Sequence, residues 1–88
     1  MPDNVEMFET DQITLAGYLA LETGVDPQME FDDSNMCYFR FPKTEECKRL
    51  VAIFMLGDAR VEPKEYWKLC SHIKRGMFEE KDALAAQG

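Results

Sequence analysis

Few residues of this chain could do chemistry, and they do not group in the usual catalytic patterns. His72 is the single histidine, so a catalytic triad or a Cys–His pair would have to use it. Cys70 and Ser71 lie close before it, but on a helix these positions face different sides from each other and from His72. Beside His72, only Asp32 and Asp33 could be nominated for catalysis. The glycines are isolated and form no phosphate-binding loop. We therefore expect no enzyme.

The three cysteines, Cys37, Cys47 and Cys70, leave two alternatives. Their odd number argues against a disulfide framework and for a reducing compartment. Their separations match no short zinc spacing, although a metal site with His72 as the fourth ligand is one alternative. All three fall on apolar faces of the elements predicted below, which favours buried structural thiols. We expect no metal and no cofactor.

The charges are divided unevenly along the chain. Residues 1–39 hold nine acids and no lysine or arginine, which gives −9, whereas residues 40–88 hold ten bases and eight acids, which gives +2. Direct nucleic-acid binding by the first half is not expected, because phosphate contacts depend on Lys and Arg. One explanation is solubility together with attraction between the two halves.

The other explanation is that the acidic half is a binding surface. Carboxylates on a helix and a hairpin can imitate the phosphates of DNA and occupy the basic groove of an enzyme. The residues that would do so are Glu9, Asp11, Glu22, Asp26, Glu30, Asp32 and Asp33.

The last predicted helix carries bases and aromatic residues that allow several interpretations. Lys64, Lys68, His72, Lys74 and Arg75 recur there, with Trp67 beside them. They could meet phosphates and stack on a base. Glu62 and Glu65 interrupt this set and the net charge of −7 repels a polyanion, so a solvated face is favoured.

Exposed aromatic residues are alternative anchors for a neutral protein partner. Tyr38 and Met36 belong to the open face of the predicted sheet, and Trp67 and Phe78 lie beside the last helix. A homodimer through the exposed sheet face or edge is a further alternative.

Hydrophobic periodicity predicts one α+β domain over residues 8–76, between a flexible lead-in at 1–7 and a fraying tail at 77–88. The order is helix, β-hairpin, helix, helix, with a small antiparallel sheet covered by helices on one face. The elements are a helix at 11–23 capped by Thr10 and Asp11, a hairpin at 28–41, and helices at 44–56 and 63–76. Residues 8–10 and 60–62 are weaker candidates for edge strands.

The hairpin sequence also predicts its register. A three-residue loop, Asp33-Ser34-Asn35 with a left-handed Asn35, places Phe31 opposite Cys37 and Met29 opposite Phe39, so that both apolar sets share one face. Glu30 and Arg40 then lie close enough on the outer face to interact weakly. Gly17 in the first helix predicts a close approach of another backbone, for which we expect the hairpin.

The stretch 44–63 is expected to organise the fold. Thr44 opens a helix, Gly57 ends it in a left-handed conformation, and Pro63 suits the first turn of the next helix. Apolar residues between Leu50 and Leu56 cover nearly the whole helix circumference, which predicts packing on several sides.

Taken together, these positions resemble a family of short bacterial and phage proteins that is known as a domain of unknown function. The resemblance spans residues 8–74 and rests on Phe8-Glu9-Thr10-Asp11, Ala16, Leu19, Gly24, Phe39-Arg40-Phe41, Phe54, Gly57, Val61, Pro63, Tyr66 and Ile73-Lys74. It implies a compact α+β domain from phages or mobile elements, and it transfers no catalytic residue and no ligand.

No apolar run approaches membrane-spanning length and no signal peptide is evident, so we expect a cytoplasmic protein with no membrane partner. The sequence predicts a small non-catalytic protein-interaction domain that binds a protein partner. The alternative is an acidic DNA mimic that inhibits a host nucleic-acid enzyme, such as a nuclease, a restriction enzyme or a CRISPR effector. The candidate partner-binding residues are Glu30, Asp32, Asp33, Tyr38 and Trp67.

Overall fold

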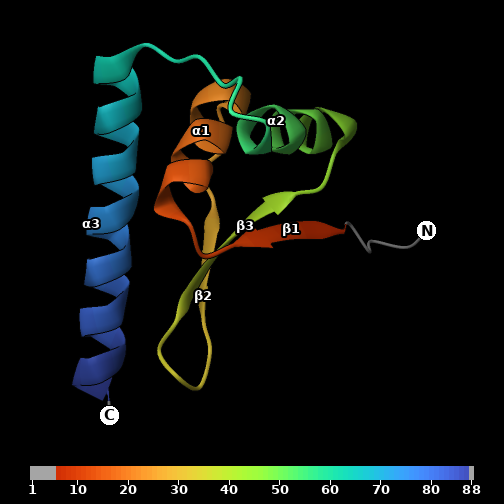
Figure 1. The fold of residues 1–88 in the computed structure, drawn as a ribbon. Helices are drawn as coiled ribbons and strands as arrows, with labels where there is room; N and C mark the ends of the chain where they lie inside the picture. The colour runs from red at the N-terminus through yellow and green to blue at the C-terminus, as the bar shows by residue number, and fades with distance from the viewer. Residues whose placement is uncertain (1–5, 88) are drawn as a thin grey trace.

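The computed structural model describes residues 6–87 and has an α+β fold (Figure 1). The expected order of helix, hairpin, helix and helix is confirmed. The expected lead-in at 1–7 falls mostly on residues 1–5, which lie outside the described residues, and Met7 already belongs to a strand. The elements are β1 (Met7–Thr10), α1 (Ile13–Thr23), β2 (Gln28–Phe31), β3 (Cys37–Pro42), α2 (Glu45–Met55) and α3 (Pro63–Gln87).

The sheet has three antiparallel strands in the order β1-β3-β2. The hairpin register is the predicted one, since Phe31 pairs with Cys37 and Met29 with Phe39. Asn35 has a φ of 65°, and the Asp32 carboxylate accepts hydrogen bonds from the backbone N–H groups of Ser34 and Met36. The turn is therefore fixed by local chemistry, as the loop length indicated. The edge strand expected at residues 8–10 exists as β1, whereas residues 60–62 form no strand.

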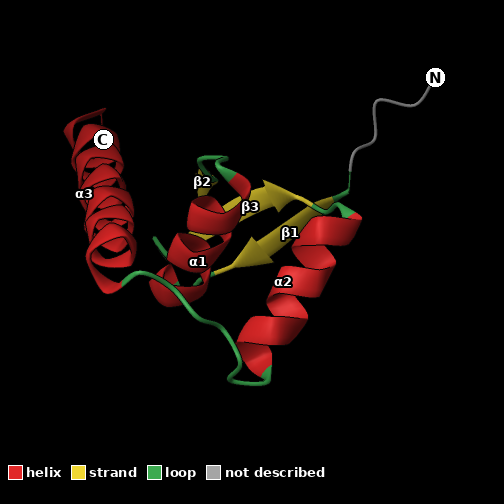
Figure 2. Ribbon diagram, turned by 90° about the horizontal axis from the view of Figure 1, so that it is seen from above, coloured by secondary structure: helices red, strands yellow, loops and turns green. Residues whose placement is uncertain are grey.

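Helices α1 and α2 lie over one face of the sheet, and α3 stands beside α1 (Figure 2). Helix α1 is buried without interruption from Leu15 to Ala20, because it packs against α2 on one side and α3 on the other. Phe39 and Phe41 of β3 complete the core below it. The centre of the fold is thus α1, and the expectation that stretch 44–63 organises the domain was wrong.

Helix α2 is packed on one side only. Cys47 and Leu50 are its buried residues, while Met55 and Leu56 are 62% and 75% exposed. The prediction of packing on several sides was wrong, because the layer of helices ends at α2 and leaves its outer side open. The number of apolar residues around a helix does not indicate how many other elements pack against it.

The helix ends follow local chemistry, with one exception. The Thr44 hydroxyl oxygen accepts a hydrogen bond from the Cys47 N–H at 3.1 Å, Gly57 has a φ of 80°, and Pro63 opens α3. At α1 the expected caps Thr10 and Asp11 do not cap. Gln12 precedes the helix without a side-chain bond, and the Thr10 hydroxyl accepts instead from the Gln12 N–H.

Gly17 lets α3, rather than the hairpin, approach α1. A Cβ atom at Gly17 would lie 2.5 Å from the Cys70 sulfur and 3.4 Å from the Tyr66 ring. The Tyr66 hydroxyl also donates a hydrogen bond to the Thr14 carbonyl oxygen at 2.7 Å. The expected close approach therefore exists, but the hairpin was the wrong partner.

Helix α3 ends at Gln87 and not at residue 76, so the tail expected at 77–88 is helical as far as residue 87. Its fraying stays a prediction. The inner side of α3 carries the predicted apolar stripe, in which Ile73 is buried and the others are partly buried: Tyr66, Leu69, Cys70, Ile73 and Met77. From Phe78 to Ala85 the helix is exposed.

Candidate functional site

The face of the sheet that points away from α1 and α2 is the main candidate site. Strand alternation and register place Glu9 of β1, Gln28 and Glu30 of β2, and Tyr38 and Arg40 of β3 on this outer sheet face. Arg40 pairs with Glu9 on one side and Gln28 on the other, while Glu30 pairs with Tyr38. Within residues 6–87 no helix covers it (Figure 2).

Arg40 holds the two edge strands to the central one. Its Nη1 lies 2.6 Å from Glu30 Oε2, and its Nε lies 3.2 Å from Glu9 Oε2. The Glu30–Arg40 contact that the register predicted is thus confirmed. Each such pair, being partly exposed, contributes only about 0.2–1 kcal/mol. Their larger effect is to fix both carboxylates in position across the sheet.

Carboxylates gather around Tyr38. The charge of Asp32 is the first cause that raises the pKa of the Tyr38 phenol, followed by burial and by the charges of Asp11 and Glu9. A groove of about 260 Å³ is lined by Glu9, Glu30, Phe31, Asp32 and Tyr38. None of these five residues is a base, and Arg40 reaches the groove only through its ion pairs with Glu9 and Glu30. We call this groove, together with Asp11, the acidic groove.

The structure brings together some of the predicted site residues and separates others. Glu30, Asp32 and Tyr38 line the acidic groove, whereas Asp33 lies in the hairpin turn and does not line it. Trp67 is 70% exposed on α3, and it belongs to a different surface. Glu22 and Asp26, at the end of α1 and in the turn after it, do not line the groove either. The acids of the first half therefore do not form one surface.

Sequence reasoning missed the central position of Arg40. It predicted the contact with Glu30 from the hairpin alone, but the second ion pair requires β1 on the other side of β3. A signal was present, because Arg40 is the first base after nine acids.

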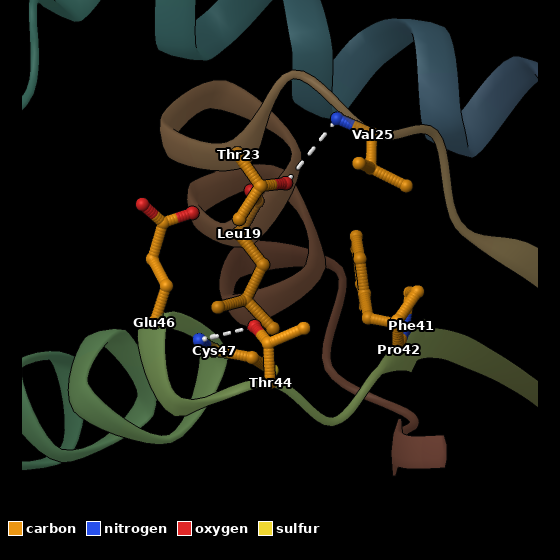
Figure 3. A pocket seen from close by; sticks show the side chains of 8 residues that line it. All are labelled: Leu19, Thr23, Val25, Phe41, Pro42, Thr44, Glu46 and Cys47. Carbon is orange, nitrogen blue, oxygen red and sulfur yellow. Dashed lines mark hydrogen bonds between the residues drawn. The ribbon is translucent and has the colours of Figure 1, made fainter. Parts of the chain in front are cut away.

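A second, smaller cavity lies between the end of α1, the end of β3 and the start of α2 (Figure 3). It has a volume of about 130 Å³, and Leu19, Phe41 and Cys47 form part of its wall. The threonine hydroxyl groups that line it are hydrogen-bonded to backbone groups. The Thr23 hydroxyl donates to the Leu19 carbonyl and accepts from the Val25 N–H, and Thr44 caps α2. Burial raises the pKa of the Cys47 thiol, which keeps it protonated. We assign this cavity no chemistry.

The other groups considered for chemistry are dispersed. Burial raises the pKa of Cys37 as well, and Cys70 packs in part against Gly17. Burial and a hydrogen bond with Cys70 raise the pKa of Tyr66 to about 12. His72 is exposed on α3. Within residues 6–87, no set of three His, Cys, Asp or Glu side chains is placed to hold a metal ion.

Comparison of the chain with models of protein families, with curated proteins and with solved structures gave no match. The resemblance to the phage and bacterial family therefore stays a prediction from the residues that carry it. Among the helices of residues 6–87, none combines the length and the apolar character needed to cross a membrane.

Proposed function

We propose that this chain is a small non-catalytic protein-interaction domain that binds a basic protein partner through its outer sheet face. The single observation that supports this most is the convergence of four carboxylates, those of Glu9, Asp11, Glu30 and Asp32, on Tyr38. Those acids outnumber Arg40 on this surface, so a partner with clustered Lys or Arg is steered toward it.

The groove has the parts of a small binding site. Tyr38 is a partly buried aromatic residue of this face that can contribute apolar contact area, whereas Phe31 also lines the groove but packs against the core. Arg40 holds Glu9 and Glu30 in position before any partner arrives, which reduces the entropy lost on binding. In this proposal the charge of the face selects the partner, and Tyr38 is the aromatic anchor.

A second candidate function is the acidic DNA mimic, encoded by a phage or mobile element. The grouping of carboxylates on one face favours it over a random scatter of acids. In this version the basic partner is a host nucleic-acid enzyme, and the carboxylates occupy the groove that phosphates would fill. The two candidates share a surface and differ in the partner.

The test is affinity capture from source-cell lysate at low and at high salt. The wild type is compared with Glu30→Gln/Asp32→Asn. Asparagine at residue 32 keeps the oxygen that accepts from Ser34 and Met36 and so preserves the turn. Glu22→Gln/Asp26→Asn is the matched control, since it removes the same charge away from the groove.

We expect the partner to be released by salt and lost with the groove variant only. If that partner is a nucleic-acid enzyme, the mimic is supported. A partner that resists salt, survives both variants and is lost with Tyr38→Ala or Trp67→Ala would instead indicate an apolar interface.

A further inference from the structure

The side of α3 that faces away from α1 carries a set of residues for which the fold provides no neighbour. Helix α3 stands at one side of the molecule in both views, with all other elements on its inner side (Figures 1 and 2). We call this the α3 outer face, and it consists of Trp67, Ser71, Lys74, Arg75, Phe78, Glu79 and Asp82. Within it Trp67 is 70% and Phe78 is 49% exposed. Two large aromatic side chains three turns apart on one exposed face are typical of an interface.

The charges of α3 are ordered by sign along its axis. Its first half carries four bases, Lys64, Lys68, Lys74 and Arg75, and one acid, Glu65. Its second half carries three acids, Glu79, Glu80 and Asp82, and one base, Lys81. Two such helices attract each other when antiparallel, because each basic half then meets an acidic half. A parallel pair would place bases against bases. The pattern is therefore complementary to itself in one orientation only.

We propose that a second copy of this chain docks on the α3 outer face, so that two α3 helices pair antiparallel about a twofold axis. With the axis at the level of Gly76 and Met77, Lys74 lies opposite Glu79 of the second copy. Ser71 then lies opposite Asp82, and Arg75 opposite Phe78, where a cation–π contact forms. Every contact occurs twice.

This arrangement gives a role to the part of α3 that extends past the core. A helix that ended at residue 76 would lack Phe78, Glu79 and Asp82, and it would have no acidic half for the partner's bases. In the proposed register Trp67 reaches the level of the last turn of the second helix, so the contact runs for about 30 Å along α3. The outer sheet face stays free in both copies, and the dimer can bind two basic sites at once.

The experiment is sedimentation equilibrium of the full chain, from micromolar to millimolar concentration, together with tryptophan fluorescence. Trp67 is the only tryptophan, so its emission reports this surface alone. We expect a monomer–dimer equilibrium and an emission maximum that shifts to shorter wavelength as the dimer forms.

Charge exchange then tests the register. Lys74→Glu and Glu79→Lys should each weaken dimerisation by about tenfold, because each substitution replaces two attractive pairs with repulsive ones. The double variant Lys74→Glu/Glu79→Lys should restore it. Lys48→Glu is the matched control, because it makes the same charge change on α2, which packs against α1 and not against α3, and its effect should be small.

Two results would overturn the proposal. One is a chain that stays monomeric with constant Trp67 emission at every concentration. The other is a dimer that ignores both single charge variants and is lost with Tyr38→Ala, which would place the contact on the sheet. Circular dichroism of each variant verifies that α3 is intact.

Discussion

The outer sheet face and the α3 outer face are both open, but their charges are arranged differently. On the sheet, four acids surround one base, and Arg40 is already paired with Glu9 and Glu30. On α3, bases predominate in the first half of the helix and acids in the second half. A surface of one sign repels its own copy and selects a partner of the opposite sign, whereas a surface of two ordered signs can pair with itself. Net charge alone therefore does not describe how this chain associates.

A substitution that destabilises the core should disrupt the outer sheet face and the α3 outer face together. Phe39 lies fully buried in β3, between Tyr38 and Arg40 of the outer sheet face, and packs in the core around α1. Phe39→Ala should lower the free energy of unfolding by about 3–5 kcal/mol, which a domain of this size barely tolerates. Urea denaturation measures the loss. Phe39→Leu should cost clearly less, and equal losses for both substitutions would contradict the packing described.

Displacement of α3 should separate the two surfaces. Gly17→Ala places a Cβ atom 2.5 Å from the Cys70 sulfur, and we expect a loss of about 1–3 kcal/mol from overpacking. Capture of the basic partner by the sheet should survive, while dimerisation through α3 weakens. Adding Cys70→Ala removes the sulfur and should recover part of the stability. A double variant less stable than Gly17→Ala would show that the close approach is not the cause.

High pH should loosen the α1–α3 contact. The pKa of Tyr66 is raised from the ordinary 10.0 to about 12 by burial and by its bond with Cys70. A raised pKa in the folded state means that this contribution to stability is fully present below pH 10 and is lost as the pH rises through about 12. Urea denaturation of the wild type and Tyr66→Phe at increasing pH measures it. The variant should show a shallower decline, and parallel curves would contradict the assignment.

The smallest expected effect is that of Arg40 on stability. Arg40→Met removes two partly exposed ion pairs, so the free energy of unfolding should fall by about 1 kcal/mol or less. The same change makes the outer sheet face more acidic and leaves Glu9 and Glu30 free to move. Thermal denaturation measures the change in the free energy of unfolding. A loss of several kcal/mol would mean that Arg40 is structural rather than a device for positioning the two acids.

The parts of the fold that sequence reasoning predicted depend on neighbouring residues. Strand alternation and a three-residue loop fixed the hairpin register and placed Glu30 and Tyr38 on one face. Thr44, Gly57 and Pro63 marked helix ends through their own backbone chemistry. These features need no knowledge of what lies across the molecule.

The parts that were missed depend on contacts between distant segments. The central place of α1 follows from two helices packing against it, and its own sequence does not reveal these neighbours. The last helix was expected to end at residue 76, but Gly76 lies inside α3, where a Cβ atom would be 3.1 Å from Met29 Cε. Asp11 acts on Tyr38 only because β1 pairs with β3. The sequence also did not show that Trp67 and the acidic groove lie on different surfaces, because this depends on the tertiary arrangement.

Binding of a basic partner to the outer sheet face is tested by the salt dependence of binding to the captured partner, measured for the wild type, Glu30→Gln/Asp32→Asn and Glu22→Gln/Asp26→Asn. Isothermal titration at several salt concentrations gives the dissociation constants. We expect affinity to fall with salt for the wild type and for the control, and we expect the groove variant to bind at least about tenfold more weakly with a reduced salt dependence. Equal affinity and equal salt dependence for all three proteins would contradict it.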